Sequence, residues 1–212
     1  MKKIIYTLLL TTLSLLIFFI FYLSTFGIET SKFNNIIIKE IKKKDPNIKL
    51  RINKIKVKFD VRKFQIYLKT LEPQIIYQDV EIPIKEINIY SKIISILKSK
   101  NEINQAIILI ENFNIQDFQK LVLRIKPSNL KTYLLNNLNS GEIEKILINV
   151  KLDGNSSIYD YQVNGSLKKV NIKVFDDLSI KDVNLNFISD KNLTLINSIS
   201  ANYQGISISN GS

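Results

Sequence analysis

The feature that most constrains this chain is a long stretch without charge near its start, running from Ile4 to Phe26. A helix rises ~1.5 Å per residue, so this stretch makes a helix about 34 Å long, enough to cross the ~30 Å hydrocarbon core of a bilayer. Its polar members are Thr and Ser, whose hydroxyls can bond to carbonyls within the helix. We therefore expect a membrane anchor that includes the apolar positions Ile4, Leu8, Leu15, Phe19 and Leu23.

The residues at the two ends of this stretch bear on its orientation and on whether it is retained. Lys2 and Lys3 precede it, which predicts a cytoplasmic N-terminus and places the rest of the chain across the membrane. A cleaved signal peptide is the alternative, but such a peptide has a shorter apolar stretch of ~7–15 residues and ends in small residues. Thr25 and Gly27 make a poor cleavage site, so an uncleaved anchor is favoured.

The composition limits the chemistry that the chain can perform. The sequence has no Cys and no His. Their absence removes disulfides, thiol nucleophiles, zinc sites of the usual ligand types and the side chain most used for proton transfer near neutral pH. The sequence also lacks a glycine-rich phosphate loop, an HExxH pair and a nucleophile elbow. We expect no catalytic residues, no metal site and no cofactor.

The formal net charge of +11 predicts an anionic partner, either nucleic acid or anionic lipid headgroups. A compositional bias toward Lys, Ile and Asn explains the same excess without any partner. One basic cluster, Lys54, Lys56 and Lys58, occupies one face of a predicted strand. A nucleic-acid surface would interleave aromatic residues with such charges, and Phe59 has the wrong parity for that role. We therefore expect no nucleic acid and a solvated or headgroup-facing surface.

An amphipathic helix is predicted over residues 31–44, immediately after the anchor, because apolar residues recur there at helical spacing. Lys42, Lys43 and Lys44 gather at its C-terminal end, where the helix dipole favours cations. Two interpretations remain open. Either the helix lies on the membrane with these three lysines facing the headgroups, or it packs against the protein and leaves its lysine face in solvent.

From Ile48 onward, apolar residues mostly alternate with polar residues, which is the period of a half-buried strand. Two helical insertions interrupt the predicted strands, one over residues 91–98 and one over residues 116–138. Pro127 breaks the second insertion, and Ser128 is placed to cap the helix that follows.

After Gly141 the sequence predicts strands alone. About six strand-like runs follow one another, separated by turn signals at intervals of roughly 8–12 residues, which is typical of an antiparallel meander. The turn signals include Asp153-Gly154, Asn164-Gly165 and Gln204-Gly205. The expected fold class is therefore mainly β with short helices, preceded by an N-terminal transmembrane helix.

Each of these runs has one apolar face and one polar face rich in Asn, Ser and Lys. An antiparallel sheet must cover an apolar face of this kind. A second sheet, the helices within residues 91–138, or an apolar ligand such as lipid chains in an open groove would all serve. Periodicity does not choose between these covers, although packing considerations alone favour a closed core.

The order of the parts along the chain is distinctive. A lone anchor ends in Phe26–Thr30, a short helix follows, and a basic strand pair then occupies Ile48–Leu68, with the small helix Ser91–Lys98 beyond it. Further on, Tyr161–Leu167 and Ala201–Ile206 have the sequence pattern of a β-repeat. In these features, and over nearly all of its length, the chain resembles the N-terminal part of the AsmA-like envelope proteins.

The resemblance implies an elongated, twisted antiparallel sheet whose apolar face forms a groove for phospholipid acyl chains. It also implies anchoring in the inner membrane, with the bulk of the chain in the periplasm, and a role in phospholipid movement toward the outer membrane or in its homeostasis. It transfers no catalytic residues. The groove contacts expected on this basis are Ile146, Ile148, Val150, Val170, Ile172, Val174, Val183, Leu185 and Phe187.

A second hypothesis makes the protein an anchored structural or assembly factor that docks onto a protein partner in the envelope. The expected organisation is an anchor over residues 1–30, an α+β membrane-proximal region over 31–140 and an antiparallel β-repeat region over 141–212. AsmA-like proteins are usually far longer than 212 residues. We therefore expect this chain to be a fragment or to work within a larger assembly.

Overall fold

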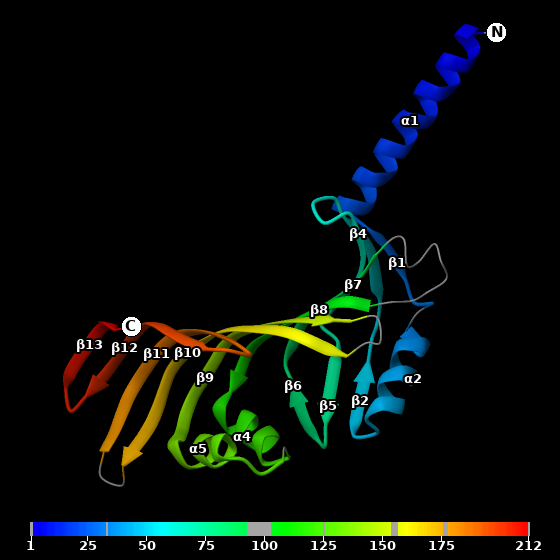
Figure 1. Ribbon diagram of the computed structural model, residues 1–212. Coiled ribbons are helices and arrows are strands. Elements are labelled where there is room, and N and C mark those ends of the chain that lie inside the picture. The colour runs from blue at the N-terminus through cyan, green and yellow to red at the C-terminus, as the bar shows by residue number, and fades with distance from the viewer. Residues whose placement is uncertain are drawn as a thin grey trace.

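The computed structural model describes residues 2–32, 34–92, 103–124, 126–153, 157–175 and 178–211. One long helix, α1 (Lys2–Thr25), projects away from a body made mainly of β-strands (Figure 1). The expected fold class is confirmed, because an apolar N-terminal helix is followed by a large antiparallel sheet with short helices.

Within the described residues, the main sheet has ten strands in the order β1-β3-β4-β7-β8-β9-β10-β11-β12-β13. Every neighbouring pair is antiparallel. Because β8 pairs with β9, the sheet is continuous across residue 140, where the sequence predicts a boundary between regions. The strands are β1 (Ile28–Thr30), β3 (Ile55–Asp60), β4 (Gln65–Leu71), β7 (Ile84–Lys92), β8 (Ile103–Asn114), β9 (Leu138–Leu152), β10 (Ile158–Phe175), β11 (Leu178–Asp190), β12 (Thr194–Tyr203) and β13 (Ile206–Gly211).

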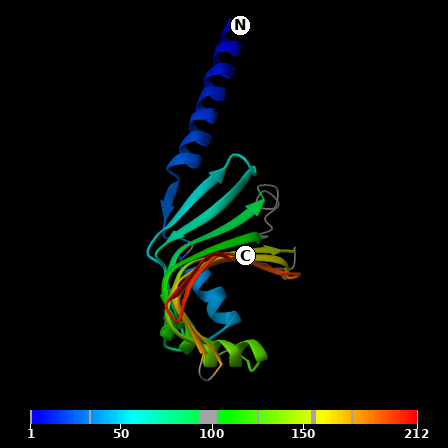
Figure 2. The same cartoon turned by 90° about the vertical axis from the view of Figure 1, so that its left-hand side faces the viewer.

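Three shorter strands, β2 (Ile48–Arg51), β5 (Gln74–Tyr77) and β6 (Val80–Ile82), form a separate antiparallel sheet. Helix α2 (Asn34–Lys44) packs beside β2. The main sheet is curved, and helices α4 (Ile115–Arg124) and α5 (Asn129–Asn137) lie on its concave side (Figure 2). The face of the main sheet that packs against α4 and α5 is called the inner face below, and the opposite face is called the outer face.

Helices α4 and α5 cover the inner face of β8, β9 and β10. Ser128 caps α5 by accepting a hydrogen bond from the Lys131 amide, as its position in the sequence predicts. Asn137 Nδ2 donates to the Lys173 carbonyl oxygen at 2.6 Å and ties α5 to β10. The hydrophobic core formed beneath the helices comprises Ile110, Phe113, Ile115, Leu138, Ile143, Val170 and Val183.

One predicted turn is absent from the described chain, because β10 runs straight through Asn164 and Gly165. Gly165 pairs with Ile146 on β9 and with Phe187 on β11. Pairing on both sides keeps this Asn-Gly sequence extended, although such a pair usually favours a hairpin turn. The glycine also admits an aromatic ring, since a Cβ at this position would lie 2.3 Å from Phe187 Cζ.

Other predictions have mixed outcomes. The turn at Gln204-Gly205 is confirmed, because both residues have positive φ, 50° and 85°, and they join β12 to β13. Ser91 and Lys92 are the last residues of β7 and do not open a helix. The rest of that predicted helix, residues 93–98, lies outside the described residues.

Candidate functional site

Helix α1 is long and apolar enough to cross a membrane, and none of its described residues is buried in the protein. The predicted anchor residues Ile4, Leu8, Leu15 and Phe19 are exposed, and Leu23 is half-buried. Threonine hydroxyls donate to carbonyl oxygens one turn earlier, as predicted from the sequence. Such bonds pair the hydroxyls of these threonines within the helix.

The C-terminal end of α1 is fastened to strand β3. The amides of Phe26 and Gly27 donate to the Tyr22 carbonyl oxygen at 2.9 and 3.1 Å, and Gly27 has a φ of 72°, a common way to end a helix. Lys58 Nζ donates to the Thr25 carbonyl oxygen at 3.0 Å, where the helix dipole favours a cation. The direction of α1 is thereby tied to the direction of β3.

Strand β1 extends this junction through two ion pairs. Glu29 lies 3.2 Å from Lys54 Nζ and 3.1 Å from Lys56 Nζ. Hydrogen bonds from Lys56 and then Lys54 lower the pKa of the Glu29 carboxyl below its usual value. The basic strand face predicted to be solvated or headgroup-facing therefore binds the chain where α1 ends and β1 follows, through Lys54, Lys56 and Lys58. Sequence reasoning missed this role because Glu29 lies far from these lysines along the chain.

The lysines at the end of α2 do not lie beside α1. In Figure 1, β1 lies between α1 and α2, and the chain turns back into β2 at the lower end of α2. Lys42 and Lys43 are exposed on the last turn of α2, and Lys44 is its last residue. Helix α2 packs beside β2, and β1 separates it from α1, whereas the expectation that Lys42, Lys43 and Lys44 face headgroups stays a prediction.

Apolar side chains cross the inner face of the sheet in rows. One row runs through Ile110, Ile146, Gly165, Phe187 and Ile196, which are successive partners on β8 to β12. Ile110 and Ile146 belong to or pack against the hydrophobic core, whereas Ile196 is 46% exposed. The row thus begins in the part of the sheet that α4 and α5 cover and continues to an exposed strand.

Two of the predicted groove residues are core residues in this structure. Val170 and Val183 are 0% and 4% exposed and share the core with Ile115 of α4. The region after Gly141 contributes no helix of its own, but α4 and α5 precede it in sequence and fold onto its inner face. The closed core favoured on packing grounds therefore exists at these two positions, and acyl chains have no room beside them.

The other predicted groove residues keep part of their surface accessible. They lie on β9, β10 and β11 beside the core. Those that pack against the core are Ile146, Ile148, Ile172 and Leu185. At the end of β10, Val174 is exposed. The half-buried members are Ile146, Ile148, Val150, Ile172, Leu185 and Phe187.

Sequence reasoning missed Ile196, the most exposed member of the row described above. The sequence by itself favours Leu193 and Leu195 as the apolar positions here. Apolar residues occur at both parities here, so alternation alone cannot assign the faces. The pairing of Ile196 with Phe187 and of Leu195 with Ile188 places Ile196 on the inner face and Leu195 on the outer face.

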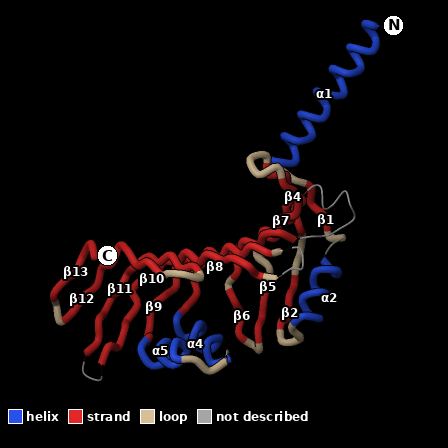
Figure 3. Tube along the Cα trace, in the orientation of Figure 1, coloured by secondary structure: helices blue, strands red, loops and turns tan. Residues whose placement is uncertain are grey.

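A second exposed feature is the hairpin connection between β3 and β4, residues Val61–Phe64, called the hairpin tip below. It is the loop beside the lower end of α1 in Figure 3. The Asp60 carboxylate accepts hydrogen bonds from the amides of Arg62 and Lys63 at 3.0 and 3.1 Å, which orders the turn. Sequence reasoning missed the tip, although apolar residues flank a basic pair there.

Lys63 fastens the hairpin tip to the outer face of the sheet. Its Nζ lies 4.4 Å from the centre of the Tyr90 ring and donates to Gln105 Oε1 at 3.2 Å. The Tyr90 ring stacks on Tyr67 with centroids 4.9 Å apart. On the inner face, the rings of Phe64 and Phe59 make an edge-to-face contact, with their centroids 5.4 Å apart.

Tyr90 of this stacked pair has a raised pKa and should titrate later than an ordinary tyrosine. Burial first, and then the neighbouring Tyr67, Asp60 and Glu86, raise the pKa of Tyr90 to about 12. Between pH 10 and 12 the unfolded chain loses this proton while the folded chain keeps it, so the free energy of unfolding falls as the pH rises through this window. An ultraviolet titration should show a late tyrosinate phase that Tyr90→Phe removes; an unchanged late phase would assign it to another tyrosine.

The described residues present apolar, charged and aromatic surfaces. In that part of the chain, no group of three or more Asp and Glu side chains is placed to hold a metal ion. The inner face offers apolar contact, and the junction and hairpin tip offer charged and aromatic groups beside α1. Comparison with protein-family models, with curated proteins and with solved structures finds no match to this chain.

Proposed function

We propose that this protein is a membrane-anchored lipid-binding protein of the AsmA-like type. In this proposal α1 crosses the inner membrane once, with Lys2 and Lys3 on the cytoplasmic side and the sheet in the periplasm. The inner face of the sheet binds phospholipid acyl chains and conducts them toward the outer membrane. The protein acts by binding and not by catalysis.

One observation carries this proposal: the apolar row on the inner face does not stop where α4 and α5 stop. It passes from Ile110 and Ile146, beside the core, through Phe187 to Ile196, which is 46% exposed. An exposed apolar face on a sheet normally marks a binding surface. The same sheet is joined directly to the end of α1 through β1 and β3, so its first strands lie next to the proposed membrane span.

The energetics suit an acyl chain. Burial of apolar chain contributes ~0.8 kcal/mol per CH₂, so a chain of roughly 16 carbons gains on the order of 10 kcal/mol on leaving water for an apolar surface. Transfer from the bilayer to such a surface is close to neutral, because both environments are apolar. A face of this kind accepts lipid without trapping it, which is the property that a conduit requires.

Neighbouring positions on β12 give a direct test. A photoreactive benzoylphenylalanine is placed either at Ile196, on the inner face, or at Leu195, on the outer face, since successive strand residues point to opposite faces. The two positions are similarly exposed, 46% and 56%. After irradiation in cells, mass spectrometry should find phospholipid adducts at position 196 and clearly fewer at position 195, which points to the opposite face.

Other outcomes would count against the proposal. Equal lipid adducts at both positions would mean that the inner face has no preference for acyl chains. Protein adducts at position 196 in place of lipid would favour the alternative function, an anchored assembly factor that docks onto an envelope partner through this face.

A further inference from the structure

The hairpin tip lies at the level where α1 ends. Chain geometry explains this placement: β1 leads away from the end of α1, and β3 pairs with it antiparallel, with Ile28 opposite Val57. Strand β3 therefore runs back toward the helix end, and Val57 to Asp60 advance by about 10 Å at ~3.3 Å per residue. Figures 1 and 2, seen from directions 90° apart, both place the loop after β3 at the level of the lower end of α1.

The position of the tip relative to α1 is fixed by bonded contacts. Lys58, three residues before the tip, donates to the carbonyl of Thr25 in the last turn of α1. At Gly27, a Cβ would lie 2.9 Å from the Val57 carbonyl oxygen, so the chain leaving α1 touches β3 directly. If α1 crosses a membrane, the tip cannot move far from the surface at which α1 emerges.

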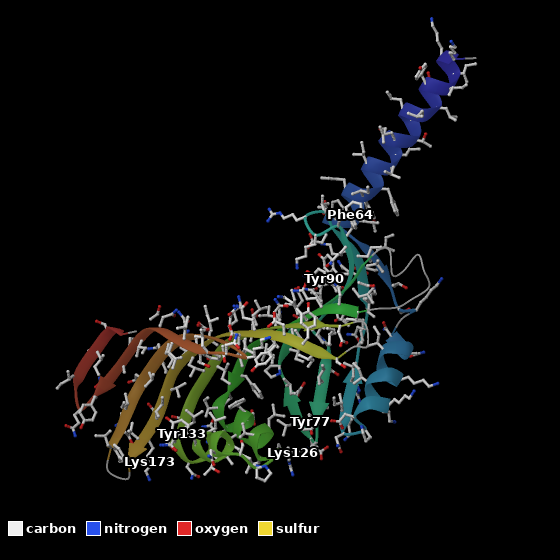
Figure 4. All side chains as sticks on the ribbon, viewed as in Figure 1. Phe64, Tyr77, Tyr90, Lys126, Tyr133 and Lys173 are labelled. Carbon is white, nitrogen blue, oxygen red and sulfur yellow. The ribbon has the colours of Figure 1, made fainter. Side chains whose placement is uncertain are left out.

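The residues of the tip are unusual for a turn in water. Val61 is 55% exposed and Phe64 is 68% exposed. Phe64 also has a φ of 53°, a left-handed conformation that bulky residues adopt at a cost. Its edge contact with Phe59 leaves most of the ring uncovered. Figure 4 shows Phe64 at the end of the body nearest α1, while Tyr133, Lys126 and Lys173 lie at the opposite end.

The charges at the tip match a lipid surface. Arg62 is exposed, and among the described residues no ion pair is found for it. Lys63 lies over Tyr90, so Arg62 is the cation of the tip directed to solvent. A guanidinium binds phosphate oxygens through paired hydrogen bonds, and an apolar pair beside it suits the boundary between headgroups and acyl chains.

We propose that the hairpin tip is a second membrane contact, in which Val61 and Phe64 enter the interface of the bilayer and Arg62 binds the phosphates of anionic phospholipids. The occupant of this surface is the same membrane that α1 crosses. The contact holds the sheet at a defined angle to the bilayer. This inference rests on α1 spanning the membrane, but it does not rest on lipid binding to the inner face of the sheet.

The absence of cysteine makes the test clean, because each single-cysteine variant carries one label. The full chain, with Phe64→Cys or Tyr133→Cys labelled by an environment-sensitive fluorophore, is placed in nanodiscs of phosphatidylcholine and phosphatidylglycerol brominated in their acyl chains. Tyr133 is the matched control, an aromatic residue that is 53% exposed at the far end of the body. We expect at least about twofold greater quenching at position 64 than at position 133, since only a label in the interface meets bromine.

Further variants make each result decisive. Val61→Cys keeps Phe64 in place and should be quenched like Phe64→Cys. Phe19→Cys reports whether α1 lies in the bilayer. In the Val61→Cys background, Arg62→Glu should reduce quenching, whereas Lys126→Glu, at the opposite end of the body, should not.

Quenching at positions 61 and 64 no stronger than at 133 would overturn the proposal, as would an unquenched label at position 19. Lipid adducts at Ile196 test the inner face separately, so the two proposals can fail independently.

Discussion

Replacement of Gly141 by alanine is expected to lower the free energy of unfolding by at least about 3 kcal/mol. Gly141 has a φ of 120°, which residues with a Cβ rarely adopt. A Cβ there would lie 2.6 Å from Val170 Cα and 2.7 Å from the Lys169 carbonyl oxygen. These atoms belong to the backbone of β10 and cannot rotate away, so β9 and β10 must separate above the core.

Gly205→Ala is the matched control for this prediction. Gly205 also has a positive φ, 85°, but an added Cβ would meet no atom within 4 Å among the described residues. It should therefore show only the backbone cost, about 1 kcal/mol. Urea unfolding of the protein in detergent, followed by tyrosine fluorescence because the chain has no Trp, measures both. Equal losses would show that the close approach of β9 and β10 contributes little to stability.

The second large effect is expected on lipid binding, from Ile196→Asp. A carboxylate on the inner face would be desolvated by an acyl chain lying against it, and a penalty of about 1.4 kcal/mol already lowers binding tenfold. We therefore expect the phospholipid that copurifies with the protein to fall about tenfold, by the same conversion. Quantitative mass spectrometry of lipid extracted from the purified protein measures this ratio.

Leu195→Asp supplies the control on the adjacent residue. It introduces the same charge at a side chain that is 56% exposed on the outer face. Because Leu195 and Ile196 are both exposed, neither change buries a charge in the folded core. Lipid content should stay near that of the unsubstituted protein in Leu195→Asp. A similar loss in both variants would point to a general effect of charge on this strand, and no loss in either would favour the docking function.

The position of the covering helices explains why two parts of the inner face differ in exposure. Beneath α4 and α5, Val170 and Val183 are sealed and stabilise the fold. On β12, farther along the sheet, Ile196 keeps nearly half of its surface exposed. One continuous apolar face thus supplies both a folding core and the proposed binding surface, so substitutions in the two parts should separate effects on stability from effects on lipid.

Local patterns in the sequence determined much of this protein. The uncharged stretch predicted α1 because helix length and bilayer thickness are fixed by backbone geometry. Ser128 predicted the start of α5, since a cap needs only its own neighbours along the chain. Alternating apolar residues predicted an antiparallel sheet with an apolar face, because successive side chains of a strand point to opposite sides.

The tertiary structure decided what that face meets. Alternation places Val170 on an apolar face but does not specify which neighbour covers it, and it assigns no face to Ile196. The folding of α4 and α5 buries Val170, and the pairing of β12 with β11 places Ile196 on the same face, where it stays exposed. Partners on both sides likewise override the turn tendency of Asn164 and Gly165. The placement of the hairpin tip beside α1 follows from the pairing of β1 with β3, residues distant in sequence. Contacts of this kind depend on register and packing, which no local pattern encodes.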